Sequence, residues 1–153
     1  MHVEITACAT FLAFYFEDRV EIRALSGRVV RQGPPARYGW VSYPVSAGGE
    51  LCANRVSEKE LVVREVESGR VLSTIALGDH ADGALAFAPR EQVLAVANAG
   101  ALELWGARAG RLLRSFPAAH LRGRPDVLGP PAFAFSADGA VAFLDGDAIV
   151  VAR

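Results

Sequence analysis

The chain has 153 residues, a formal net charge of −1, and hydrophobic side chains at 52% of its positions. This length suffices for one domain with a sizeable core, and the balanced charge favours neither nucleic acid nor an anionic membrane as a partner. No apolar run approaches the roughly 20 residues that a membrane-spanning helix needs.

The N-terminal stretch from Ile5 to Phe16 is apolar, but no basic segment precedes it, and Glu4 stands where a signal peptide carries positive charge. We interpret it as strands of a folded domain. The two cysteines, Cys8 and Cys52, lack the spacing of a metal or redox site, so we expect buried free thiols and a cytoplasmic location. Lys59 is the only lysine among 16 basic residues, a composition that indicates a GC-rich, bacterial source.

Short apolar runs bounded by Gly, Pro and Asn recur along the whole chain and predict antiparallel strands joined by tight turns. Gly and Pro interrupt the sequence too often for an amphipathic helix of about 12 residues. The predicted strands are Val3–Ile5, Phe11–Phe16, Val20–Leu25 and Val29–Arg31; Val41–Val45, Leu51–Val56, Leu61–Val66 and Val71–Ile75; Leu85–Phe87, Val93–Ala97, Leu102–Trp105 and Leu112–Phe116; and Phe133–Phe135, Val141–Leu144 and Ile149–Val151.

An internal repeat organises these strands. A turn glycine followed by arginine recurs at Gly27, Gly69 and Gly110, with spacings of 42 and 41 residues. A period of about 40 to 45 residues with four strands per unit is typical of the blades of a β-propeller. The sequence therefore predicts a single all-β domain of four blade-like repeats, at residues 1–32, 40–75, 84–116 and 132–153, of which the last lacks its fourth strand.

The hydrophobic pattern fits a stack of small sheets. The predicted second strands, such as Phe11–Phe16 and Val93–Ala97, are apolar nearly throughout, which indicates burial on both faces. The predicted third strands alternate instead, and we expect Glu21 and Arg23 to lie on a face wetted by solvent.

The third repeat resembles a WD40 repeat. The resemblance rests on His80 before the first strand, on the segment Leu85–Pro89, and on Leu102–Trp105 followed by a glycine turn; Gly106 stands where the family has an aspartate after the tryptophan. The resemblance implies a partial WD40-like β-propeller. It also implies that His80 and the equivalent His120 are structural and hydrogen-bond within a blade beneath the tryptophan, which is Trp105 here.

In the WD40 family, the loops that join one blade to the next lie on the rim that usually binds partners. Aromatic and arginine residues are enriched in binding hot spots. The resemblance therefore implies partner-binding side chains in two such loops. For Trp40, packing in the core is an equal alternative, and the arginines also fit a solvated surface. The candidate residues are Arg37, Tyr38, Trp40, Arg122 and Arg124.

No catalytic, cofactor or metal motif stands out. A metal pair of His80 and His120 would need further ligands, and Asp145-Gly146-Asp147 is a tight hairpin turn rather than a cation loop. We expect a non-catalytic protein–protein interaction or scaffold module without a cofactor. The alternative is a small propeller that binds a ligand or metal, lectin-like or enzymatic.

The incomplete last repeat predicts assembly. The strand Ile149-Val150-Val151 would leave an apolar edge, and the outward faces of the first and last repeats would lack neighbours. We expect a homo-oligomer or another protein to complete the propeller. Closure with four blades is the competing arrangement.

Overall fold

The computed structural model describes residues 2–5, 11–33, 44–57, 59–78, 84–90, 92–98, 100–118, 133–145 and 148–152. Over these ranges the chain forms fourteen strands in four antiparallel sheets and contains no helix, so the predicted all-β fold is confirmed. These ranges accordingly include no helix with the length and apolar composition that crossing a membrane requires.

Each sheet is built from strands that are consecutive in the chain, in the order in which they occur. The first sheet contains β1 (His2–Ile5), β2 (Phe11–Tyr15), β3 (Val20–Ala24) and β4 (Val29–Gly33). The second contains β5 (Leu51–Ser57), β6 (Glu60–Glu65) and β7 (Val71–Ala76). The third contains β8 (Leu85–Phe87), β9 (Val93–Asn98), β10 (Ala101–Gly106) and β11 (Arg111–Pro117). The fourth contains β12 (Phe133–Phe135), β13 (Val141–Asp145) and β14 (Ala148–Ala152).

These strands lie where the sequence predicted them, with one partial exception. The predicted strand Val41–Val45 is described only at its end, where Val45 forms a single antiparallel bridge with Cys52. Val45 therefore occupies the place that β1, β8 and β12 have in the other sheets, beside the second strand.

The backbone shows the same repeat as the sequence. Gly27, Gly69 and Gly110 each precede the outer strand of a sheet with a positive φ of 87°, 66° and 59°, a conformation that other residues rarely adopt. In the same three sheets the pairing of the last two strands shifts register at one equivalent point. These shifts fall between Ile22 and Arg23, between Val63 and Arg64, and between Leu104 and Trp105.

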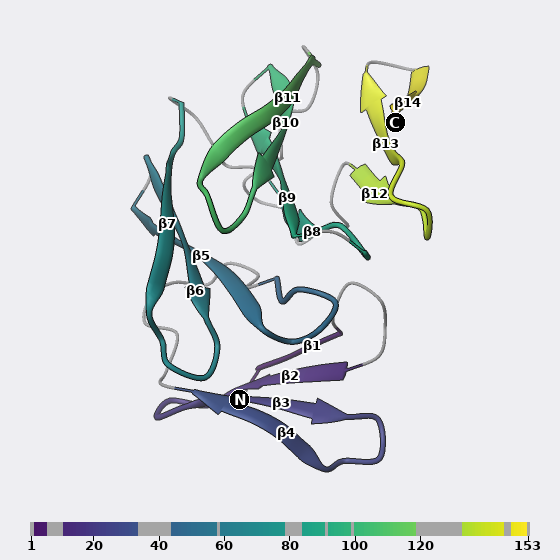
Figure 1. Cartoon of the computed structure of the whole chain (residues 1–153). Coiled ribbons are helices and arrows are strands. Elements are labelled where there is room, and N and C mark those ends of the chain that lie inside the picture. The colour runs from purple at the N-terminus through teal and green to yellow at the C-terminus, as the bar shows by residue number, and fades with distance from the viewer. Residues whose placement is uncertain are drawn as a thin grey trace.

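The four sheets pack face to face in chain order and form a curved stack (Figure 1). One core joins the first sheet to the second, another the second to the third, and another the third to the fourth. Alternate residues of a middle strand enter different cores. On β9, Leu94 and Val96 face the second sheet, whereas Ala95 and Ala97 face the fourth. Burial on both faces explains why these strands are apolar throughout.

The first and fourth sheets are the two ends of the stack. Among the buried clusters of the described residues, none joins the fourth sheet back to the first. β14 is the last strand of its sheet, whereas β3 and β10 each pair with a further outer strand, β4 and β11. Within the described ranges, the fourth sheet thus ends one strand earlier than the first and third.

Candidate functional site

Most side chains singled out from the sequence lie outside the described residues. This holds for the five predicted partner-binding residues and for the two histidines predicted to be structural, which all stay predictions. They are Arg37, Tyr38, Trp40, Arg122, Arg124, His80 and His120. The structure does describe Trp105 and the predicted assembly edge, Ile149, Val150 and Val151.

Trp105 lies on β10 between the second and third sheets. Its half-buried ring packs against the core that joins these sheets, and its indole Nε1 donates a hydrogen bond to Glu103 Oε2 at 3.1 Å. The apolar body of the ring therefore lies against the core while its polar group is hydrogen-bonded within the same strand.

The third strand of each sheet, β3, β6, β10 or β14, gives a common frame for comparing the sheets. Each follows a hairpin, and we number its positions from the residue that closes the hairpin pairing, with position one at Arg19, Glu60, Ala101 and Ala148. Odd positions lie on the face toward the preceding sheet, which we call the front face. Even positions lie on the face toward the following sheet, which we call the back face.

The back face of the fourth sheet exposes side chains that the other sheets bury. At positions two and four, the first three sheets carry residues that are buried or half-buried beneath the next sheet: Val20 and Ile22, Leu61 and Val63, Leu102 and Leu104. The same positions of β14 are Ile149 and Val151, which are 73% and 63% exposed. The predicted apolar edge is therefore also part of an apolar face without a neighbour in the described structure.

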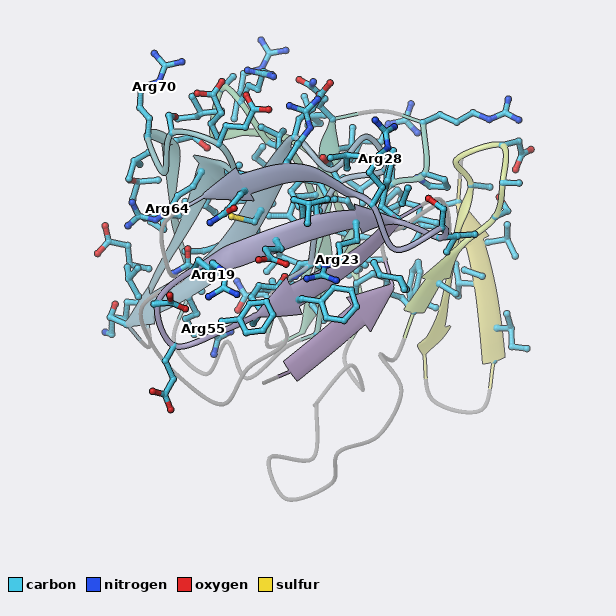
Figure 2. All side chains as sticks on the ribbon, turned by 90° about the horizontal axis from the view of Figure 1, so that it is seen from below. Arg19, Arg23, Arg28, Arg55, Arg64 and Arg70 are labelled. Atoms are coloured by element: carbon cyan, nitrogen blue, oxygen red, sulfur yellow. The ribbon has the colours of Figure 1, made fainter. Side chains whose placement is uncertain are left out.

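The front face of the first sheet carries a cluster of charges at positions one, three and five. The guanidinium groups of Arg19 and Arg23 donate to the two oxygens of Glu21, at 2.7 Å and 2.9 Å from their Nε atoms. Figure 2, seen from the side of the first sheet, shows Arg19 and Arg23 over this face. They lie 4.2 Å and 5.0 Å from the ring centroids of Phe16 and Phe14, as cation–π contacts require.

This cluster corrects one expectation from the sequence. Glu21 was predicted on a wet face, yet it is only 5% exposed because the two arginines and the strands beneath them cover it. The hydrogen bonds from Arg19, and then those from Arg23, lower the pKa of the Glu21 carboxyl below its ordinary value. Glu21 is therefore held as a paired carboxylate.

At position seven, in the turn after the third strand, the first sheet differs from the second and third sheets in burial. Val66 and Ala107 occupy it in the second and third sheets, are 3% and 0% exposed, and belong to the cores shared with the preceding sheet. Both donate their backbone N–H to the turn between the first two strands, at Glu50 O and Gln92 O, over 2.8 Å. The equivalent Leu25 of the first sheet is 66% exposed. The front end of the stack thus also exposes an apolar side chain at a contact position.

A cavity of about 330 Å³ lies between the third and fourth sheets. Its walls are mainly apolar, and Arg114 and Asp138 add polar groups. At position five of the third strand, Ala152 stands on β14 where the larger Trp105 stands on β10. The apolar residues that line the cavity are Ala88, Val93, Leu104, Leu113, Phe135 and Ala140.

Cys52 is buried and not bonded to another cysteine, as predicted; Cys8 lies outside the described residues. Burial raises the pKa of the Cys52 thiol to about 11, against a smaller opposing effect of the Arg64 charge. Within the described ranges, no three side chains of His, Cys, Asp or Glu gather in a way that could hold a metal ion.

The most prominent surface feature of the described chain is therefore the pair of exposed ends, with Leu25 at the front and Ile149 and Val151 at the back. Comparison of the chain with models of known protein families and with curated proteins gives no match.

Proposed function

We propose that this chain is a non-catalytic protein–protein interaction module, built as part of a WD40-like β-propeller whose sheets are the blades. Another chain covers the back face of its fourth sheet. The observation that carries the proposal is the exposure of Ile149 and Val151 at positions that the other three sheets cover with a neighbouring sheet. The shared turn glycines and register shifts support the interpretation of the sheets as repeated blades.

The physical driving force is the burial of this face. Covering Ile149 and Val151 contributes about 2 kcal/mol for each side chain before the cost of association. The strand β14, with sequence AIVVA, carries neither charge nor proline, the devices that usually keep an edge strand from pairing. An edge and a face of this kind favour a partner that contributes β-structure.

The proposed module needs no cofactor, and its residues act by contact. The buried thiol of Cys52 suits a reducing, cytoplasmic compartment. The loop residues Arg37, Tyr38, Trp40, Arg122 and Arg124 are a second proposed contact region, on the rim that the resemblance to WD40 repeats implies.

The cavity between the third and fourth sheets favours one alternative function, the binding of a small ligand. Its volume of about 330 Å³ is within the range of small-molecule sites, and Arg114 and Asp138 would orient a polar group. A thermal-shift screen with metals and small molecules tests this alternative. A rise of several degrees with one compound, in a chain that binds no protein, would favour it over the interaction module.

The test of the interaction module is the size of the particle that contains the chain in extracts of its native cell. We expect the tagged chain to migrate in an assembly larger than its own 16.2 kDa. The Val151→Asp substitution should release the chain from this assembly, because burying an unpaired carboxylate in the contact is costly. Val71→Asp is the matched control, at an apolar residue of β7 that is also partly exposed. A wild-type chain that migrates at 16.2 kDa both in extracts and when purified contradicts the proposed function.

A further inference from the structure

We propose that the covering chain is a second copy of this protein, and that the front face of its first sheet docks on the back face of the fourth sheet. This inference rests on the proposed interaction function and names the partner. It follows from a comparison of the two exposed ends with the contact that already exists between the third and fourth sheets.

In the second strands, that internal contact brings small side chains together with large ones. The third sheet contributes Ala95 and Ala97 on its back face, and the fourth sheet contributes Val141 and Phe143 on its front face. Alternation of large and small residues across a contact allows two sheets to interdigitate. The third and fourth sheets thus show which side chains form a working contact in this chain.

The two exposed ends carry the same pattern. In the second strands, the residue paired with position four is alanine in every sheet, and on the fourth sheet this residue is Ala142, which lies on the uncovered back face. The residues paired with positions three and five of the first sheet are Phe14 and Leu12, which correspond to Phe143 and Val141 of the fourth. In the second strands, a contact between the fourth sheet of one copy and the first sheet of another would therefore repeat the internal one.

Leu25 provides independent support. At its position, Val66 and Ala107 are buried beneath the preceding sheet. A sheet packed on the front face of the first one would bury Leu25 in the same way. A second copy accounts for Leu25 and for Ile149 and Val151 with one kind of contact, whereas an unrelated partner at either end would leave the other end exposed.

The charges on the front face are compatible with such a contact. Glu21 is already paired with Arg19 and Arg23, and Arg19 also pairs with Asp18 at 2.8 Å, so these four charges sum to zero. Front faces inside the stack also carry charged residues, such as Glu103 beside Trp105. Covering a neutral, hydrogen-bonded cluster costs much less than burying an isolated charge.

The proposed contact joins two different surfaces, so it either closes into a ring or extends into a filament. Two copies that close about a twofold axis would give a ring of eight sheets, which is within the four to eight blades known for propellers. We therefore expect a particle of twice 16.2 kDa for the purified protein.

Two variants and one control test the contact by light scattering over a range of concentrations. Leu25→Asp changes the front face and Val151→Asp the back face, and each should weaken association at least about 100-fold. Both residues are exposed in the single chain, so its fold should tolerate the changes. Val71→Asp should associate like the wild type. The equivalent of Val71 is Val29 in the first sheet, which no preceding sheet covers, and Leu112 in the third. The exposed fractions are 41% for Val29 and 43% for both Val71 and Leu112, so a covering sheet does not change the exposure of this position.

Mixing the variants distinguishes this contact from a symmetric one. The Leu25→Asp chain keeps an intact back face and the Val151→Asp chain an intact front face, so an equal mixture should form a pair with one unaltered contact. A dimer that joins two back faces would not be restored by mixing, and that result would overturn the proposal. As a measurement without substitution, amide hydrogen exchange in β14 should slow as the concentration of the wild-type protein rises.

The remaining outcomes separate this inference from the proposed function. The purified chain could stay at 16.2 kDa at every concentration and enter a larger assembly only with a different protein. That result would contradict a second copy as the partner but would agree with the proposed interaction module. A chain that is monomeric in all settings, with β14 protected from exchange at any concentration, indicates closure within one chain and overturns both.

Discussion

Gly33 and Val66 bring the backbones of the first and second sheets into direct contact. A β-carbon added at Gly33 would lie 1.6 Å from the carbonyl oxygen of Val66 and 2.7 Å from its carbonyl carbon. Gly33 is buried at the end of β4, and Val66 belongs to the core that joins the two sheets. Only glycine allows this approach, because the obstructing atoms are backbone and have little room to move.

Replacing this glycine should therefore separate the two sheets locally. We expect Gly33→Ala to lower the free energy of unfolding by about 3 kcal/mol, at the upper end of the cost of overpacking. The control is Gly48→Ala, whose added carbon would meet only the exposed Glu50 side chain, at 3.4 Å. Urea unfolding of both variants measures the difference. Equal stabilities for the two variants would contradict a direct backbone contact between Gly33 and Val66.

Glu21 should make the stability of the chain depend on pH in the acidic range. Its pKa is lower in the folded chain than the ordinary value of 4.5, because Arg19 and then Arg23 donate hydrogen bonds to the carboxylate. The folded chain therefore binds this proton less tightly than the unfolded chain. The resulting stabilisation is fully present above pH 4.5 and is lost as the pH falls through the lower folded-state pKa.

The comparison is between the wild type and Glu21→Gln, by urea unfolding from neutral pH down to about pH 3. The wild type should be the more stable protein at neutral pH, and the difference should shrink as the pH falls below 4.5. Glu60→Gln, at an exposed carboxylate of β6, controls for the loss of one negative charge. A difference that stays constant over the whole range would contradict a paired carboxylate at Glu21.

Cys52 should react with thiol reagents only when the chain unfolds. Burial raises its pKa to about 11. At pH 8 roughly one such thiol in a thousand is ionised, compared with about a quarter of free cysteines. Alkylation of Cys52 in a Cys8→Ser background should therefore be on the order of 100-fold slower in buffer than in denaturant. Similar rates in the two conditions would place the thiol at the surface.

The strands were predictable because each sheet repeats the same physical problem. A middle strand such as β9 is covered on both faces, which requires a continuous apolar run, and a tight turn with positive φ requires a glycine such as Gly69. Both requirements leave direct traces in the sequence. All but one of the predicted strands are accordingly found in full within a residue or two of their predicted limits.

The contacts between sheets were not predictable in the same way. Glu21 was expected to face solvent because it alternates with apolar residues, but alternation distinguishes only two faces and does not say what covers each. The two arginines that bury it are its neighbours at i−2 and i+2, on the same face of the strand. An Arg-x-Glu-x-Arg pattern on a strand is the signal that would have indicated this pairing.

The equivalence of positions also explains the candidate site. The sequence predicted an unpaired edge at Ile149 to Val151 and uncovered outward faces of the first and last repeats. Its predicted third strands begin at equivalent positions, at Val20, Leu61, Leu102 and Ile149, and the strand pairings agree with this alignment. The hairpin pairings give this comparison directly, whereas the number of residues from the start of the second strand to position one differs between sheets. What the structure adds is the exposure of the individual side chains, 73% for Ile149 and 63% for Val151.

The cavity between the third and fourth sheets should accept a large side chain at Ala152. In the contact between the second and third sheets, Trp105 and Leu72 both pack against a core that includes Val63. One repeat later, the equivalents of Leu72 and Val63, which are Leu113 and Leu104, line the cavity, and Ala152 replaces the tryptophan.

We therefore expect Ala152→Trp to raise the free energy of unfolding by about 1 kcal/mol, as other cavity-filling substitutions do. Ala148→Trp is the matched control, since it adds the same ring to the same strand at an exposed position. Thermal and urea unfolding of the two variants give the comparison. A loss of stability in Ala152→Trp relative to the control would mean that the cavity cannot hold an indole ring.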